Sequence, residues 1–179
     1  MANNIIIGVD PSGNFHEGKG TTGICALKCG TNKMLSVQPI SAKDFKSAEE
    51  YWLAHLDMFQ GFIDANYHIK LVVEDYLLYE TKALAQSNSR METSQLIGCI
   101  RLWCHQKQVP LKIQPASMVK TRWTNEILEH KRYIKHNPNG KGWATNDRER
   151  PVNRHCIDAI RHAVHEDMFG DKEWMKNDI

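Results

Sequence analysis

Short apolar runs alternate with amphipathic stretches along this chain, and their order predicts a sheet flanked by helices. Three β-branched runs over residues 4–10, 21–28 and 34–40 predict strands joined by hairpin-like connections. Apolar residues at helical spacing then predict a helix over residues 48–65, which begins after a capping-box pattern. A buried strand over residues 69–74 follows, and a strand without polar alternation is typical of a central, parallel position.

The second half of the chain is predicted to be mostly helical. We expect a helix over 91–108, a short strand over 109–113, helical structure over 117–135, a loop over 136–151, a last helix over 151–168 and a flexible tail over 170–179. The order β-β-β-α-β-α-β-α-α predicts one α/β domain over residues 1–179. Its five-stranded mixed sheet would begin with an antiparallel meander of three strands.

Composition narrows the class of protein. The chain has 179 residues, of which 41% are apolar and 25% charged, as is typical of a globular domain. The five cysteines are odd in number and form no Cys-x-x-Cys pair, which argues against a disulfide framework and a zinc site. There is no apolar leader and no window of about 18 apolar residues, so we expect a cytoplasmic protein without a membrane span.

The charges are unevenly distributed, although the net charge is only +2. Between Lys112 and Arg154 there are ten Lys or Arg residues and four Asp or Glu residues. A local basic excess is typical of a surface that binds phosphate groups. A solvated polar face is the alternative interpretation.

Four residues with metal-binding side chains lie at predicted element ends. Asp10 ends the first strand, Glu74 ends the fourth, and His155 and Asp158 share one face of the last helix. If strands one and four are parallel neighbours, Asp10 and Glu74 emerge side by side at the usual ligand-binding edge. Such an oxygen-rich site suits Mg²⁺ or Mn²⁺, and two ions per site can activate water and stabilise the leaving oxygen of a phosphodiester.

Each of these residues also has a purely structural interpretation. An Asp before Pro often shapes a turn, and one member of the Glu74–Asp75 pair can simply be solvated. His155 and Asp158 can form an ordinary solvent-facing pair on a helix. Their joint occurrence at strand, strand and helix ends favours the metal site.

Four segments resemble the RuvC family of Holliday-junction resolvases, in particular its bacteriophage branch. They are residues 7–11 (IGVDP) with 22–23 (TG), 72–76 (VVEDY), 115–120 (PASMVK) and 155–159 (HCIDA). The resemblance covers nearly the whole chain and implies a ribonuclease H-like fold. It implies metal ligands at Asp10, Glu74 and Asp158, His155 as a ligand or an acid–base group, and Lys120 near the scissile phosphate. It also implies a homodimer that cuts two strands of a four-way DNA junction.

The same resemblance, together with the basic stretch, indicates candidate DNA contacts. These are Lys120, Arg122 and Arg154, with Tyr76 or Tyr79 as an aromatic wedge at the junction. Neither tyrosine lies at the family's usual offset, and core packing is the alternative for both. The loop expected over residues 136–151 is longer than the corresponding loop in the family.

The helix expected over residues 91–108 is the candidate dimer contact. Leu96, Ile100 and Trp103 lie on one stripe, with Cys99 and Leu102 beside it. This apolar face is broader than packing on one sheet requires, and a two-fold dimer would use it twice. The alternative is that the whole face packs inside the monomer.

Three other functions compete with junction resolution. A terminase-type or hybrid-cleaving nuclease of the ribonuclease H-like class would share the metal site and differ in substrate. A junction-binding module without catalysis would tolerate loss of a carboxylate, yet every expected position is occupied. An actin-like or sugar-kinase ATPase needs two domains and a Gly-rich adenosine motif, and this chain is too short and has no Gly-Gly pair.

Overall fold

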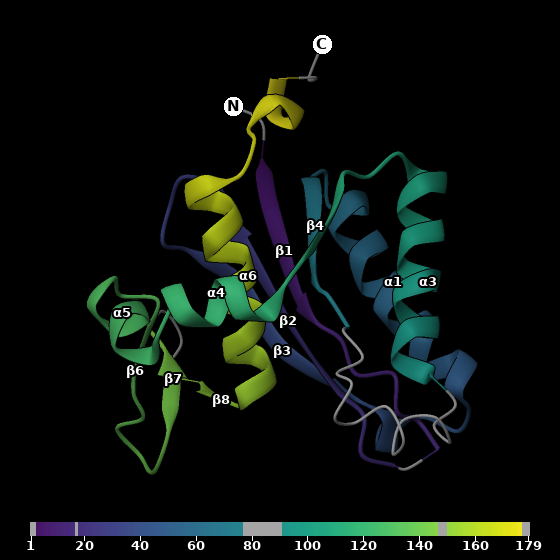
Figure 1. Cartoon of the computed structure of the whole chain (residues 1–179), viewed down its shortest axis with the longest axis horizontal. Coiled ribbons are helices and arrows are strands. Elements are labelled where there is room, and N and C mark those ends of the chain that lie inside the picture. Colours follow the sequence, from purple (N-terminus) through teal and green to yellow (C-terminus); the bar gives the residue numbers. More distant parts are fainter. Residues whose placement is uncertain (1–2, 17, 77–90, 147–149, 177–179) are drawn as a thin grey trace.

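A computed structural model of the chain describes residues 3–16, 18–76, 91–146 and 150–176, and a five-stranded mixed sheet forms its centre (Figure 1). The strand order is β3-β2-β1-β4-β5. The strands are β1 (Asn4–Asp10), β2 (Thr21–Lys28), β3 (Met34–Ser41), β4 (His68–Glu74) and β5 (Leu111–Gln114). The first three form the expected antiparallel meander, while β4 runs parallel to both β1 and β5.

The register of the central strands decides which side chains meet at the sheet edge. Val9 of β1 lies opposite Val73 of β4, so the next residues, Asp10 and Glu74, leave the sheet side by side. The fifth strand begins later than expected because the Val109 amide still donates to the Cys104 carbonyl at the end of the preceding helix. This shift places Gln114, at the end of β5, directly opposite Glu74.

Helices cover both faces of the sheet (Figure 1). One face carries α1 (Ala48–Asp64) and α3 (Glu92–Lys107), and the other carries α4 (Ala116–Arg122), α5 (Asn125–His130) and α6 (Arg154–Phe169). The Ser47 hydroxyl accepts a hydrogen bond from the Glu50 amide, as the capping-box pattern predicts. Among the described helices, none is long and apolar enough to span a membrane.

Two glycines allow α6 to lie very close to the sheet. A Cβ atom at Gly8 of β1 would come 2.1 Å from the Ala159 carbonyl oxygen, and one at Gly23 of β2 would come 2.1 Å from the His155 backbone. Any larger residue would therefore push α6 away. This close packing carries the first turns of α6, with His155 and Asp158, to the end of β1.

The loop prediction for residues 136–151 is wrong, because this part of the chain contains a second sheet. Its antiparallel strands are β6 (Ile134–His136), β7 (Trp143–Thr145) and β8 (Pro151–Val152). Strands of two or three residues are too short to show a period of two in the sequence. The last helix accordingly begins at Arg154, after Asn153 caps it by accepting a hydrogen bond from the Cys156 amide.

Part of the expected tail packs against the sheet. A short 3-10 helix, η3 (Glu173–Lys176), follows α6, and its Trp174 is buried. The Lys70 ammonium lies 5.9 Å from the centre of the Trp174 ring. The flexibility of the tail stays a prediction, and residues 177–179 lie outside the described part of the chain.

Candidate metal centre

Three acidic side chains from distant parts of the sequence converge at the carboxyl ends of β1 and β4. Asp10 ends β1, Glu74 ends β4 and Asp158 belongs to α6, which packs on β1, β2 and β4. One carboxylate oxygen from each lies within 4.8 Å of the other two. They line an open cleft of about 420 Å³ together with Lys120, Arg154, His155 and Arg161. The structure thus brings together the three carboxylates that sequence analysis singled out.

Asp10 and His155 form a pair on one side of this cluster. His155 Nδ1 lies 2.7 Å from Asp10 Oδ2. Burial raises the pKa of Asp10, and the nearby carboxylates of Glu74 and Asp158 raise it further, against the lowering effect of the His155 hydrogen bond. The same hydrogen bond raises the pKa of His155, although burial opposes the rise. His155 therefore orients Asp10 here, and its role as a ligand or acid–base group stays a prediction.

Glu74 is held by two cationic or hydrogen-bonding side chains. His162 Nε2 lies 3.0 Å from Glu74 Oε2, and Lys120 Nζ lies 3.2 Å from Oε1. Burial alone would raise the pKa of Glu74, but the His162 hydrogen bond and the Lys120 charge outweigh it and hold the pKa below its usual value. His162 and Gln114 are both 0% exposed, and His162 Nδ1 lies 2.7 Å from Gln114 Oε1. The Glu74 carboxylate is thus fixed from behind by buried side chains on α6 and β5.

Asp158 has a cation on each carboxylate oxygen. Arg161, one turn further along α6, donates to Oδ1, and Lys120 Nζ lies 3.0 Å from Oδ2. Arg161 also donates to the Trp123 carbonyl at 2.7 Å and to Asn125 Oδ1 at 2.6 Å. A planar guanidinium with several fixed partners is rigid. Arg161 therefore ties the carboxylate to the segment between α4 and α5.

Lys120 is the counter-ion shared by Glu74 and Asp158. Burial lowers the pKa of its ammonium, but the two carboxylates outweigh that effect and raise it overall. Its side chain is 40% exposed and reaches the cleft from α4. A long, flexible, partly solvated side chain can change its partner without disturbing the fold.

The turn after Asp10 is braced by a buried network under α1. Tyr51 Oη donates to the Ser12 carbonyl at 2.6 Å, and Thr22 Oγ1 accepts from the Ser12 amide at 3.1 Å. His55 Nε2 lies 2.9 Å from Thr22 Oγ1, and its Nδ1 lies 2.7 Å from the Tyr51 carbonyl oxygen. Burial lowers the pKa of His55 to about 4, so this histidine is neutral near pH 7. The network fixes the direction in which the chain leaves β1.

The donor atoms of the cluster fit a hard divalent cation. All three clustered groups are carboxylates, and oxygen donors are the ligands that Mg²⁺ and Mn²⁺ prefer. Like charges held this close repel one another, and a cation relieves the repulsion. The residues that would hold it are Asp10, Glu74 and Asp158. The number of ions and their identity stay predictions.

The other predicted site residues lie at different distances from the cluster. Arg154 is exposed and lines the cleft. Arg122 is exposed, and its guanidinium carbon lies 3.8 Å from the centre of the Phe169 ring. Tyr76 is partly buried against the core between the sheet, α1 and α3. Tyr79 lies outside the described residues.

The stripe proposed as a dimer contact is part of the monomer core. Leu96 and Ile100 are 0% exposed and Trp103 is 8% exposed, with its ring 5.8 Å from that of Phe59 on α1. The interpretation of this stripe as surplus apolar surface is therefore wrong. Leu102, at 59% exposure, is the large apolar side chain that α3 leaves in solvent among the described residues.

Sequence analysis missed Arg161, His162 and Gln114. The signal for His162 was present, since His155, Asp158 and His162 follow helical spacing and share one face of α6. Gln114 could not be identified because its position depends on the pairing of β5 with β4. The role of Arg161 could not be predicted from helical spacing, because it depends on contacts with the segment between α4 and α5.

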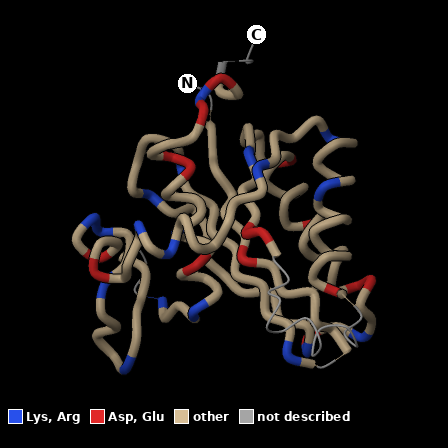
Figure 2. The backbone as a smooth tube through the Cα atoms, in the orientation of Figure 1, with Lys and Arg blue, Asp and Glu red and all other residues tan. Residues whose placement is uncertain are grey.

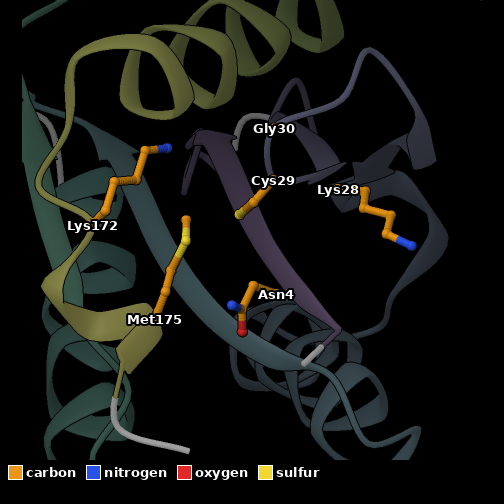
Figure 3. A pocket seen from close by; sticks show the side chains of 6 residues that line it. All are labelled: Asn4, Lys28, Cys29, Gly30, Lys172 and Met175. Carbon is orange, nitrogen blue, oxygen red and sulfur yellow. The ribbon is translucent and has the colours of Figure 1, made fainter. Parts of the chain in front are cut away.

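A second hollow at the opposite edge of the sheet differs in chemistry. It has a volume of about 240 Å³, and Asn4, Cys29, Lys172 and Met175 face it, while Lys28 points away (Figure 3). Lys172 pairs with Asp167 at 2.9 Å, and burial raises the pKa of Cys29 to about 12. The hollow has no clustered carboxylates and no activated thiol among its lining residues. The acidic cleft is therefore the stronger candidate site.

Comparison with known proteins identifies the fold. No protein-family model matches the chain, and no curated protein matches its sequence significantly. Among solved structures, Thermus thermophilus RuvC in complex with a Holliday junction substrate is similar, with a TM-score of 0.62 and 16% identity over 92% of this chain and 93% of that one. A further structure of Thermus thermophilus RuvC has a TM-score of 0.58 and 14% identity, covering 89% and 91% of the two chains. At such identities the likeness shows the fold alone, and this chain has the ribonuclease H-like fold seen in RuvC, as the sequence predicted.

Proposed function

We propose that this protein is a metal-dependent endonuclease that resolves four-way DNA junctions by phosphodiester hydrolysis. The observation that carries the proposal is the cluster of Asp10, Glu74 and Asp158, whose oxygens lie within 4.8 Å on a RuvC-like sheet. Three carboxylates held this close repel one another even with their cationic partners, which favours a site that binds a metal cation.

The surrounding residues have distinct roles in this proposal. Bound divalent cations, two per site, would polarise the phosphate and lower the pKa of the attacking water. His162 and Arg161 hold the Glu74 and Asp158 carboxylates in place, as supporting residues do in metal sites. Lys120 points into the cleft, where its ammonium can bind a phosphate oxygen. His155, with Nδ1 on Asp10, has Nε2 left to accept a proton from water.

The proposed substrate is branched DNA, and two observations favour it. The RuvC structure that this chain resembles was solved with a Holliday junction. Lys120 and Arg154, which line the cleft, are basic, as phosphate contacts require. Arg122, which shares α4 with Lys120, is a further proposed phosphate contact. Tyr76 and Tyr79 remain the proposed aromatic contacts with the junction.

A symmetric homodimer is part of the proposal, because resolving a junction needs paired cuts and each chain holds one acidic cluster within its described residues. The contact surface cannot be the buried stripe of α3. Its exposed side, around Leu102, stays available. Sedimentation equilibrium at micromolar concentration, with and without junction DNA, tests this. A monomer under both conditions would contradict paired cutting and favour a nuclease that makes single cuts.

One assay separates the competing functions. Labelled four-way junction, plain duplex and RNA–DNA hybrid are incubated with the protein in Mg²⁺, in Mn²⁺ or in chelator, and the products are resolved on a gel. We expect metal-dependent, symmetric nicks in the junction and far slower cutting of duplex and hybrid, with Asp10→Asn as the inactive control. Preferred cutting of hybrid or duplex would indicate another ribonuclease H-like nuclease. Junction binding without any cutting would indicate a binding module.

A further inference from the structure

The second sheet and its described connections, residues 131–146 and 150–154, form a basic region next to the acidic cleft, which we call the basic arm. The described residues of the arm include six Lys or Arg and no Asp or Glu, while Asp147, Arg148 and Glu149 lie outside the described part of the chain. Lys131, Arg132, Lys141, Arg150 and Arg154 are all exposed. Among the described residues, no carboxylate makes an ion pair with any of these five side chains. Within the described part of the chain, the charge of these five side chains is therefore not neutralised by an ion pair.

The basic arm is anchored to the core. Tyr133 and Ile134 are almost fully buried in the core beneath α6, and Trp143 and Val152 pack against the same core. Lys135 of β6 pairs with Ala144 of β7, which is fully buried. The His136 ring stacks on the Trp143 ring, with the ring centroids 4.2 Å apart. Rigid anchoring allows exposed charges to be held in a fixed arrangement.

The tip of the β6–β7 hairpin is polar and locally ordered. The Asn137 amide donates to the Gly142 carbonyl at 3.0 Å, which closes the hairpin. The Asn139 amide donates to Asn137 Oδ1 at 3.0 Å, and Gly142 adopts a φ of 89° that favours glycine. A polar tip with a following lysine, Lys141, is suited to a polar partner.

The arm is continuous with the proposed active site. β8 pairs with β7 through Ala144 and Pro151, and only Asn153 separates it from α6. Arg154, the first residue of α6, lines the acidic cleft. Figure 1 shows the second sheet beside the first turn of α6, and Figure 2 shows Lys and Arg spread over this side of the molecule. A chain of positive charge therefore runs from the cleft to the hairpin.

The chemistry of the arm fits a nucleic acid better than a protein partner. The exposed large apolar side chains of the described residues are Leu53, Leu102, Met118, Ile127, Met168 and Phe169, and none belongs to the arm. Protein interfaces depend on buried aromatic or apolar anchors at their centre. A basic, polar surface without such anchors is typical of contact with a phosphate backbone.

We propose that the basic arm binds the phosphate backbone of one duplex arm of the DNA substrate, outside the cleavage centre. This inference rests on the proposed function. It adds the path by which one duplex arm of the DNA leaves the cleft. Contacts with the backbone are made equally before and during reaction, so they raise affinity and leave the rate of the chemical step unchanged. They are also independent of base sequence.

The test compares two triple variants with the same change of charge. The arm variant combines Lys131→Gln, Lys141→Gln and Arg150→Gln, and the control combines Lys43→Gln, Lys46→Gln and Lys107→Gln on the α1 and α3 side. Binding to a four-way DNA junction and to duplex RNA is measured by fluorescence anisotropy across a range of salt concentrations, in an Asp10→Asn background that prevents cleavage. Single-turnover cleavage is measured without that background change, at rising protein concentration.

We expect the arm variant to bind at least about tenfold more weakly, with the slope of log K against log salt reduced by about 0.9 for each lost contact. Its cleavage rate at saturating protein should match the wild type, and the control should match the wild type in every measurement. The three single arm variants should each lose about one unit of slope, which covers the case in which the triple variant folds poorly.

Three results would overturn the inference. Equal slopes and affinities for the arm variants and the control would show that the arm does not contact DNA. A lower saturating rate with unchanged affinity would place the arm in the chemical step. Lost binding of duplex RNA with retained binding of junction DNA would make RNA the partner. Wild-type protein that neither binds nor cuts any DNA would instead overturn the proposed function itself, so the two failures are distinguishable.

Discussion

Each helical layer of this protein contains a fully buried histidine, and the two histidines have different partners. His55 of α1 and His162 of α6 are both 0% exposed. His55 contacts a backbone carbonyl and the Thr22 hydroxyl, so it is a satisfied core residue. His162 contacts the Glu74 carboxylate and the Gln114 amide. Burial alone therefore does not distinguish the two histidines, whereas their partners do.

The same two layers differ in surface charge. Residues 42–64, which include α1, contain two Lys and five Asp or Glu, whereas residues 131–154 contain seven Lys or Arg and two Asp or Glu. Asp158 of the carboxylate cluster belongs to α6, and Figure 2 shows several Lys and Arg positions along the segments around this helix. A polyanionic substrate would be attracted to the α6 layer and repelled by α1. The comparison predicts that changes in the α6 layer affect activity, and that matched changes in the α1 layer affect stability alone.

The largest effect is expected from the three clustered carboxylates. Asp10→Asn, Glu74→Gln and Asp158→Asn should each reduce junction cleavage by more than about 100-fold, beyond the range typical of supporting residues. Folding and junction binding should persist, because removing one carboxylate relieves repulsion. The matched control is Asp57→Asn, an exposed acid on α1. Cleavage within tenfold of the wild type in any of the three would remove that residue from the site.

The next largest effect should separate the two buried histidines. His162→Ala should weaken Mn²⁺ binding by about 10–100-fold, since it leaves the Glu74 carboxylate without its support. His55→Ala should leave Mn²⁺ affinity unchanged and lower the free energy of unfolding by about 1–3 kcal/mol. Calorimetric titration and chemical denaturation measure the two quantities. His162→Gln, which keeps a hydrogen-bond donor, should recover part of the affinity, and equal metal affinities in His162→Ala and His55→Ala would contradict the distinction.

Acid should destabilise the protein through His55. Its pKa is about 4 in the folded protein and near 6.5 otherwise, so between these values the unfolded chain binds a proton that the folded chain does not. The contribution of neutral His55 to the free energy of unfolding is therefore complete above pH 6.5. It falls by about 1.4 kcal/mol for each pH unit below that value, which amounts to about 2 kcal/mol at pH 5. His165, whose pKa is also lowered by burial, adds to the same trend. Denaturation curves of wild type and His55→Gln from pH 7 to 5 measure it, and parallel curves would rule out His55 as the cause.

The main sheet and the acidic triad were predictable from the sequence, because both depend on local patterns. Strand boundaries followed β-branched runs that end at Asp10 and Glu74, and the parallel pairing of β1 and β4 then places these residues together. The shared face of His155 and Asp158 followed from helical spacing.

The parts that were missed depend on contacts between distant segments. The second sheet consists of strands too short to show alternation, and it is held by Ile134, which is buried in the same core as the apolar residues of α6. The apolar stripe of α3 was misinterpreted because it was judged too broad to pack on a sheet alone. In the structure α1 also covers it, with Phe59 against Trp103. Helical periodicity shows which side chains share a face, but it does not show how many neighbours that face meets.

The smallest effect is expected from Lys120, and Lys112 provides its matched control. Each lysine is 40% exposed and pairs with a buried carboxylate of α6, Lys120 with Asp158 and Lys112 with Glu166. Each carboxylate also has a second cation, Arg161 on Asp158 and Lys70 on Glu166, but Asp158 lies within 4.8 Å of two further carboxylates. Removing Lys120 therefore leaves three acids with less counter-charge, which lowers the melting temperature in chelator and gives Mg²⁺ more repulsion to relieve.

Mg²⁺ should stabilise Lys120→Ala by about 1 kcal/mol more than it stabilises the wild type. The increase in melting temperature on adding Mg²⁺ should therefore be about 2–4 °C larger in the variant. Lys112→Ala should also melt earlier in chelator, because Glu166 loses one of its two cations, but the shift produced by Mg²⁺ should equal that of the wild type. Differential scanning fluorimetry measures the melting temperatures of the wild type and of both variants with Mg²⁺ and with chelator. The same Mg²⁺ shift in Lys120→Ala and Lys112→Ala would mean that the ammonium between Glu74 and Asp158 does not compete with a metal ion. Lys120 would then be a fixed part of the site, able to bind phosphate only from the position it already holds.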